Sequence, residues 1–177
     1  MDEPDEVLDL VDGRDEKTGT IIREDVMKLV AGVPGFVRAA NAFIINARGE
    51  LWVPRRTAQK KIAPSGLDFS VGEHVQTGET YEAAIVRGFA EELGLSITSA
   101  DVAYVGKVTP EQSGVPYFEV LFLYRADNVP PYKQDDFTSY GWLMPAELQA
   151  KLIAGEPAKK GLAPSIELLQ SYIKGKG

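Results

Sequence analysis

The sequence of 177 residues contains no cysteine, which excludes disulfides, thiolate metal sites and cysteine nucleophiles. Positive charge is also scarce, because 19 Lys and Arg stand against 26 Asp and Glu and leave a net charge of −7. This acidity argues against a duplex nucleic-acid binder, which usually presents a basic face. No apolar run approaches the length of about 18 residues that a membrane span needs, and the first residues are acidic where a secretion signal is positive. We therefore expect a cytoplasmic protein without membrane or nucleic-acid partners.

Length and hydrophobic patterning predict one α+β domain over residues 1–177. An N-terminal hairpin and short helix occupy residues 1–36, a core follows over 37–155, and a linker with a C-terminal helix fills 156–177. Strands are expected at 7–11, 20–23, 37–45, 51–53, 67–71, 102–108, 115–125 and 137–143, and helices at 24–30, 80–93, 145–153 and 164–173. Because strands and helices do not alternate strictly, the pattern favours a mixed β-sheet sandwiched between helices.

The helix expected at 80–93 carries the most informative residues of the chain. Thr80 can cap its start with a hydroxyl, and Gly94 supplies a stop. At about 100° per residue, Gly88, Glu91 and Glu92 should lie on the arc opposite the apolar one. The apolar arc is expected to contain Val86, Phe89, Ala90 and Leu93.

The spacing around this helix resembles the signature of the Nudix hydrolases, G-x5-E-x7-R-E-U-x-E-E-x-G-U, where U is a bulky aliphatic residue. Glu79, Arg87, Glu91, Glu92, Gly94 and Leu95 match that signature at its fixed separations. The resemblance extends over nearly the whole chain, to the Nudix subgroup allied to isopentenyl-diphosphate isomerases. It includes the segments LDLVDGRDEKTGTIIRED, ANAFIINARGELWVPRRTAQKK and SYGWLMPAEL.

This resemblance implies a Nudix fold with its core at 37–155, and a pyrophosphohydrolase that cleaves phosphoanhydrides with Mg²⁺, or alternatively Mn²⁺. Mg²⁺ prefers oxygen ligands and lowers the pKa of an attacking water. The family pattern implies that Glu91, Glu92 and the carbonyl of Gly72 hold this metal. It also implies that Arg87 and Glu79 hold the catalytic constellation in place.

A basic run at 55–61 contrasts with the acidic chain around it. Arg55, Arg56 and Lys60, with Lys61 beside them, are candidates for binding substrate phosphates, because Arg presents a planar fork to such groups. The alternative is a solvated loop, or arginines that clamp carboxylates of the fold. If these side chains bind phosphate, they should contribute to the affinity for the substrate rather than to the stability of the fold.

Two positions depart from the Nudix signature. Glu73 stands at the first Gly, and Gly88 stands where the family has a metal-binding Glu. Either catalysis is lost or another acid has taken over, and a glutamate restored at position 88 is expected to raise hydrolysis. The candidate replacements are Glu73, Glu111, Glu119, Asp135 and Asp136. The alternative for each of them is that it is an ordinary surface acid. His74, the one histidine, is a candidate base or a plain loop residue.

Two functions follow from these residues. The leading hypothesis is a Mg²⁺-dependent hydrolase of nucleoside diphosphates or related X-linked diphosphates, weakened by Gly88. The alternative is a Nudix-fold protein that binds a nucleotide diphosphate in a regulatory role without cleaving it. Isopentenyl-diphosphate isomerase fits the subgroup, but that family uses a catalytic cysteine and this chain has none. The sequence leaves open the substrate, the general base, and whether the protein is a monomer or a homodimer.

Overall fold

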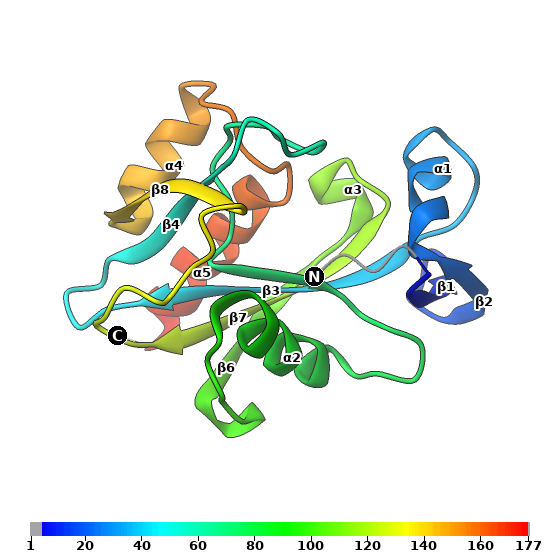
Figure 1. The fold of residues 1–177 in the computed structure, drawn as a ribbon, viewed down its shortest axis with the longest axis horizontal. Helices are drawn as coiled ribbons and strands as arrows, with labels where there is room; N and C mark the ends of the chain where they lie inside the picture. The colour runs from blue at the N-terminus through cyan, green and yellow to red at the C-terminus, as the bar shows by residue number, and fades with distance from the viewer. Residues whose placement is uncertain (1–4, 177) are drawn as a thin grey trace.

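A six-stranded mixed sheet forms the centre of the computed structural model, which describes residues 5–176 (Figure 1). Its central strand is β3 (Val37–Ile45), which pairs in parallel with β7 (Tyr117–Arg125) along its whole length. The other edge of β3 is shared by two antiparallel partners, β5 (Val71–His74) and the start of β4 (Leu51–Arg56). The outer strands are β6 (Val102–Val108), beside β7, and β8 (Phe137–Leu143), beside β4.

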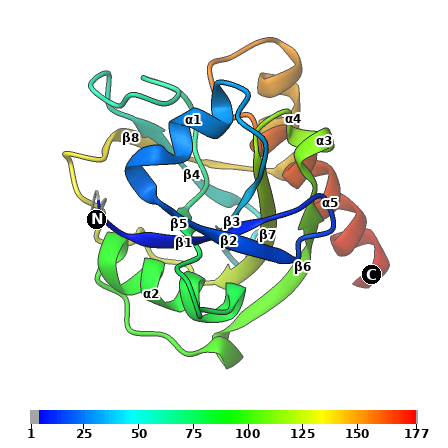
Figure 2. The ribbon, with the colours of Figure 1, turned by 90° about the vertical axis from the view of Figure 1, so that its right-hand side faces the viewer.

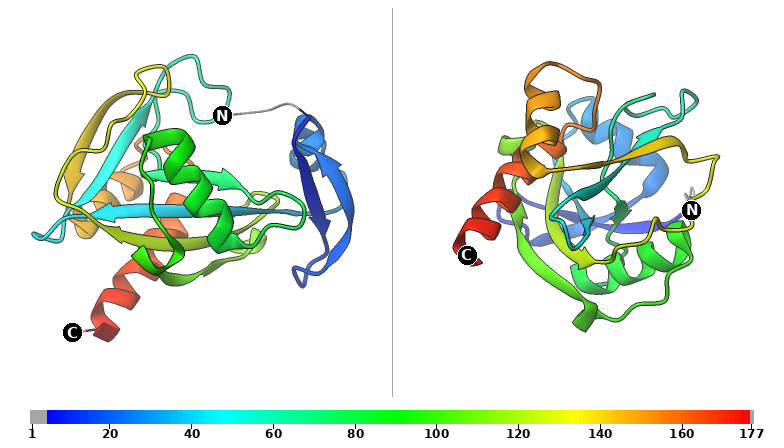
Figure 3. Two further views of the ribbon diagram at one scale, coloured as in Figure 1. Left: turned by 60° about the horizontal axis from the view of Figure 1, so that its bottom comes forward. Right: turned by 90° about the vertical axis from the view of Figure 1, so that its left-hand side faces the viewer.

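Helices cover both faces of this sheet (Figure 3). Because side chains alternate along a strand, Ala40, Ala42 and Ile44 of β3 pack against α2 (Tyr81–Leu93). Phe43 and Ile45 face the other way, onto α5 (Leu162–Lys176). The predicted α+β architecture, a mixed sheet sandwiched between helices, is confirmed.

The N-terminal segment forms a separate two-stranded hairpin at one end of the molecule (Figure 1), the end that faces the viewer in Figure 2. It contains β1 (Val7–Val11), β2 (Lys17–Ile22), a 3-10 turn η1 (Arg23–Asp25) and the short helix α1 (Val26–Val30). Asp15, in the turn, adopts a positive φ of 62° and accepts bonds from Arg38 Nε at 2.6 Å and Tyr81 OH at 2.8 Å. Lys107 also pairs with it, so one carboxylate ties the hairpin to the core.

Most expected elements are present, and several expectations need correction. The strand β2 begins at Lys17 rather than at residue 20, and the helix expected at 24–30 is divided into η1 and α1. The strand β4 continues to Arg56, so the first two arginines of the basic run lie on a strand and not in a loop. The strand predicted at 67–71 begins only at Val71, because Leu67 makes isolated bridges to Arg55 and Ala158 instead of a continuous ladder. The last helix is longer than expected, since α5 continues to Lys176. The remaining elements are η2 (Ser99–Asp101), α3 (Pro110–Ser113) and α4 (Pro145–Ile153). None of the helices between residues 5 and 176 combines the length and apolar composition needed to cross a membrane.

Candidate functional site

The helix α2 begins and ends as the sequence predicts. The Thr80 hydroxyl accepts a bond from the Ala83 amide at 3.0 Å, and Gly94 closes the helix with a left-handed φ of 62°. The predicted arcs are wrong at two positions, because Gly88 is buried and Ala90 is exposed. Gly88 faces inward since it shares the buried arc with residues three and four positions away, and this arc packs on β5.

The close approach of α2 to β5 depends on Gly88. A Cβ at this position would stand 2.6 Å from Glu73 Cγ and 2.9 Å from Val71 Cγ1, closer than side-chain carbons approach. Glu73 is only 6% exposed, so its interpretation as an ordinary surface acid is wrong. Its side chain fills the space beside position 88, where the Nudix signature expects a glutamate.

Arg87 organises the acids at this end of α2. Its Nε and Nη2 donate to the two oxygens of Glu79 at 2.9 and 3.0 Å, a bidentate pair. Nη1 reaches Glu73 at 3.1 Å and Glu91 at 3.4 Å, and Nη2 also donates to the His74 carbonyl at 2.8 Å. Burial by itself would lower the pKa of Arg87, but its acidic partners raise the pKa above the ordinary value. The hydrogen bond with Glu79 contributes most to that rise. Arg87 therefore brings three glutamates and β5 together.

Glu73 and Glu92 form a carboxyl pair between α2 and β5. Burial raises the pKa of Glu73, while Arg87 and the hydrogen bond with Glu92 work against that rise. Burial raises the pKa of Glu92 much further, and the negative charges of Glu73 and Asp68 add to it. Two carboxyl groups this close cannot both ionise without cost, so the pair needs either a proton or a cation.

This pair tests whether a divalent metal fits the predicted donor set. Across residues 5–176, no three His, Asp or Glu side chains are already arranged as a complete metal site. Carboxylate oxygens are nevertheless the ligands that Mg²⁺ prefers, and a backbone carbonyl can complete such a set. Glu91 is more exposed than Glu92 and lies beside Arg87. The chemistry of these oxygen donors suits a divalent cation, and metal binding by Glu91, Glu92 and Gly72 stays a prediction.

A second buried acid lies on the opposite face of the sheet. Glu119 is 9% exposed and accepts a bond from Asn41 Nδ2 at 3.1 Å, so its surface interpretation is also wrong. Within the described part of the chain, its Oε2 is a buried oxygen with no hydrogen-bond partner. Burial raises the pKa of Glu119, and a Cβ on Gly161 would collide with its carboxylate. Asn41 was detectable in the sequence as a polar residue within an apolar strand, but its pairing with Glu119 was not.

The predicted phosphate-binding residues are each engaged by a carboxylate. Arg55 pairs with Glu156 and donates to the Ser65 carbonyl. Arg56 donates to Asp68 at 2.5 Å, a carboxylate whose side chain is only 6% exposed. Lys60 also has a carboxylate partner, because its ammonium donates to Asp136 at 2.6 Å. These contacts favour the clamping alternative, and phosphate binding by the loop stays a prediction.

The other candidate residues do not gather at α2. Glu111 and Asp135 are exposed. His74 lies on β5 rather than in a loop, with Nε2 3.4 Å from Tyr117 OH. Burial, together with the charge of Arg23, lowers the pKa of His74 to about 3. The imidazole is therefore neutral at physiological pH.

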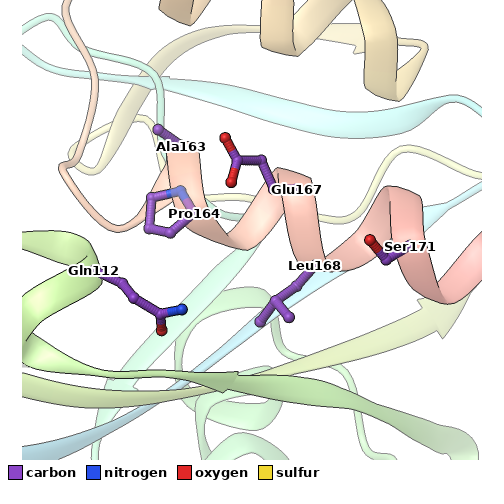
Figure 4. Close-up of a pocket in the computed structure, with 6 residues that line it drawn as sticks. All are labelled: Gln112, Ala163, Pro164, Glu167, Leu168 and Ser171. Atoms are coloured by element: carbon purple, nitrogen blue, oxygen red, sulfur yellow. The ribbon is translucent and has the colours of Figure 1, made fainter.

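A separate hollow of about 460 Å³ lies between α3 and α5 (Figure 4). Its lining residues are Gln112, Ala163, Pro164, Glu167, Leu168 and Ser171. None of the acids around Arg87 lines it, and neither do the residues of the 55–61 loop. This hollow is therefore distinct from the carboxylate cluster.

Comparison with known proteins gives four informative similarities. The NUDIX domain family matches residues 35–165. The uncharacterized Nudix hydrolase all7351 of Nostoc sp. is 41% identical over 167 residues, 94% of this chain and 95% of that protein. The crystal structure of DR0079 from Deinococcus radiodurans has a TM-score of 0.80 at 39% identity, covering 92% of this chain and 98% of that one. Isopentenyl-diphosphate Delta-isomerase of Salmonella agona is 31% identical over 75% of this chain and 74% of its own.

Proposed function

The chain belongs to the Nudix hydrolase family and has its α+β fold, and from this premise we propose that it is a Mg²⁺-dependent hydrolase of nucleoside diphosphates or related X-linked diphosphates. Members of this family act on diphosphate compounds and generally depend on a divalent metal. The observation that carries the proposal is the position of Glu73, which fills the space beside Gly88 and pairs with Glu92. Glu73 thus supplies, from β5, the carboxylate that position 88 lacks.

In this proposal Glu92, Glu91 and the Gly72 carbonyl hold the metal, with Glu73 as the additional ligand. When bound, the cation neutralises diphosphate oxygens and lowers the pKa of an attacking water. Mn²⁺ could take the place of Mg²⁺, since both accept oxygen ligands. Burial of Glu73 and its bond to Arg87 fix its carboxylate before any ligand binds.

Arg87 and Glu79 are positioning residues in the same proposal. The bidentate pair leaves Arg87 one guanidinium edge for Glu73 and the His74 carbonyl. Glu79 in turn accepts a bond from the Gln76 amide at 2.9 Å, which fixes the turn between β5 and α2. The network therefore sets the distance between the strand and the helix that carry the acids.

The second candidate is a Nudix-fold protein that binds a nucleotide diphosphate without cleaving it. Gly88 favours this alternative, because the signature glutamate at that position is absent. Isomerisation is disfavoured despite the similarity to the Salmonella isomerase, because that family's mechanism uses a cysteine. The two remaining candidates differ in one observable, the release of product in the presence of Mg²⁺.

The test measures phosphoanhydride cleavage over a panel of nucleoside diphosphates and nucleoside diphosphates linked to a second group. We expect Mg²⁺-dependent product from the wild type, and a loss of about 10²-fold or more in Glu73→Gln and Glu92→Gln. Glu111→Gln is the matched control, since Glu111 is an exposed acid away from α2. Tight analogue binding without turnover by the wild type would replace the hydrolase with the binding protein. Full activity in Glu73→Gln would remove Glu73 from the ligand set.

A further inference from the structure

Lys159 reaches the carboxylate cluster from a distant part of the chain. Its backbone is held beside Leu67, because the Leu67 amide donates to the Pro157 carbonyl at 2.8 Å and the Lys159 amide donates to the Leu67 carbonyl at 3.0 Å. Leu67 and Ala158 form a parallel bridge within the same contact. The segment is therefore fixed, while the side chain that extends from it is 29% exposed.

The ammonium of Lys159 lies near Gly72, whose carbonyl is a predicted metal ligand. Its Nζ is 3.4 Å from Asp68 Oδ1 and 3.8 Å from the place that a Cβ on Gly72 would take. Burial raises the pKa of Glu119, and the charge of this ammonium works against that rise. Lys159 is therefore a cation beside Gly72 and Asp68, between the strand β5 and the segment that precedes it.

The other cations of this region are committed to closer partners. Arg56 donates to Asp68 at 2.5 Å and to the Ile62 carbonyl at 2.8 Å. Arg87 is bound by Glu79, Glu73 and the His74 carbonyl. Lys159, by contrast, makes its ion pair with Asp68 at the long distance of 3.4 Å, and its flexible four-carbon stem carries a compact point charge. Its ammonium can thus change partners at lower cost than either guanidinium can.

We propose that Lys159 is a phosphate-binding residue that neutralises the acids around Gly72 in the metal-free protein and turns its ammonium to a substrate phosphate oxygen once a divalent cation takes its place. This inference rests on the proposed function. A divalent cation and an ammonium at neighbouring positions repel each other, so the metal drives the side chain outward. A metal-bound diphosphate then offers that ammonium an anionic partner.

The proposal makes two predictions of opposite sign for Lys159→Met, which keeps the length of the side chain and removes its charge. By calorimetry without nucleotide, Mg²⁺ should bind about threefold more tightly, because a competing cation is gone. With Mg²⁺ present, a nonhydrolysable methylene analogue of a nucleoside diphosphate should bind about tenfold more weakly, because a charged hydrogen bond is lost. Lys159→Arg should keep most of the analogue affinity.

Lys160→Met is the matched control, because Lys160 is the adjacent residue and is exposed. It should match the wild type for both ligands. If Lys159 only clamps Asp68, Lys159→Met will weaken Mg²⁺ and analogue binding together and lower the thermal midpoint, which overturns the proposal. Unchanged binding of both ligands overturns it as well.

The failure of this inference can be told from the failure of the proposed function. A wild-type protein that hydrolyses diphosphates, combined with a Lys159→Met variant like the wild type in both titrations, rejects the role of Lys159 alone. A wild-type protein that binds Mg²⁺ and the analogue but cleaves nothing rejects the hydrolase. In that second case, tighter Mg²⁺ and weaker analogue binding by Lys159→Met still support the role of Lys159.

Discussion

The Cγ atom of Glu73 lies 2.6 Å from the position that a Cβ atom would take on Gly88. There is therefore room for only one side chain where β5 and α2 meet, and it is the side chain of Glu73 on β5. The Nudix signature places the glycine on the strand side and the glutamate on the helix. Each departure from the signature thus accommodates the other, which neither position reveals when it is considered alone.

The first prediction concerns an exchange of these two residues. Gly88→Glu alone should destabilise the protein by about 1–3 kcal/mol and lower hydrolysis, because the new side chain collides with Glu73 and Val71. The double variant Glu73→Gly with Gly88→Glu should recover part of both losses, since it removes the contact with Glu73. Urea unfolding and Mg²⁺-dependent turnover measure the cycle.

Gly88→Ala is the control for the helix. Alanine favours helix by about 1 kcal/mol over glycine, yet its Cβ meets the same atoms, so we expect a net loss of stability. A single Gly88→Glu variant that is more active than the wild type would contradict this account. The sequence alone predicts that Gly88→Glu raises the hydrolytic activity. The burial of Gly88 leads to the opposite expectation.

The sequence predicts local features better than it predicts the partners of buried charges. Thr80 and Gly94 bound α2 as expected, because capping depends on neighbouring residues. The position of Gly88 was predicted wrongly, since the buried arc of α2 is set by its contact with β5 and not by apolar residues alone. Lys159 carried no signal, because 91 residues separate it from Asp68 and only the tertiary fold brings them together.

The second prediction separates stability from metal binding at Glu92. Burial and the charges of Glu73 and Asp68 raise its pKa, which means that its ionised form costs folding free energy without a cation. Glu92→Gln should therefore raise the thermal midpoint of the metal-free protein at pH 7. The same variant should lose most of its Mg²⁺ affinity, so added Mg²⁺ should stabilise the wild type more than the variant. Calorimetric melting with and without Mg²⁺ measures both effects. If Glu92→Gln melts at a lower temperature than the wild type in the presence of a chelator, the ionised Glu92 does not destabilise the metal-free protein.

The third prediction compares the two arginines at the end of β4. Arg56→Ala leaves the buried Asp68 without its closest cation and should cost about 3–5 kcal/mol. Arg55→Ala removes a more exposed pair with Glu156 and should cost about 1 kcal/mol or less. Chemical denaturation of the two variants gives the comparison. Equal and negligible losses, together with weaker diphosphate binding, would return both residues to the phosphate-binding role.

The fourth prediction concerns acid stability and the N-terminal hairpin. Burial alone would raise the pKa of Asp15, but hydrogen bonds from Lys107, Arg38 and Tyr81 hold it below its ordinary value of 3.8. A carboxylate with a depressed folded pKa stabilises the fold above its unfolded pKa, and this contribution is lost as the pH falls below about 4 toward the folded pKa. Asp15→Asn should therefore cost about 2–3 kcal/mol at pH 7, where charged hydrogen bonds are lost.

The asparagine variant isolates the charge, because asparagine tolerates the positive φ of 62° at this turn nearly as well as aspartate does. The difference in unfolding free energy between Asp15→Asn and the wild type should stay constant from pH 7 to pH 5. It should then narrow below about pH 4, as the wild-type carboxylate takes up its proton. Asp12→Asn is the matched control in the same turn, since Asp12 bonds only backbone amides of its own loop in the contacts described for residues 5–176. A difference that does not narrow in acid would mean that Asp15 holds the hairpin by the shape of its turn, and that its pairing with Arg38 and Lys107 contributes little.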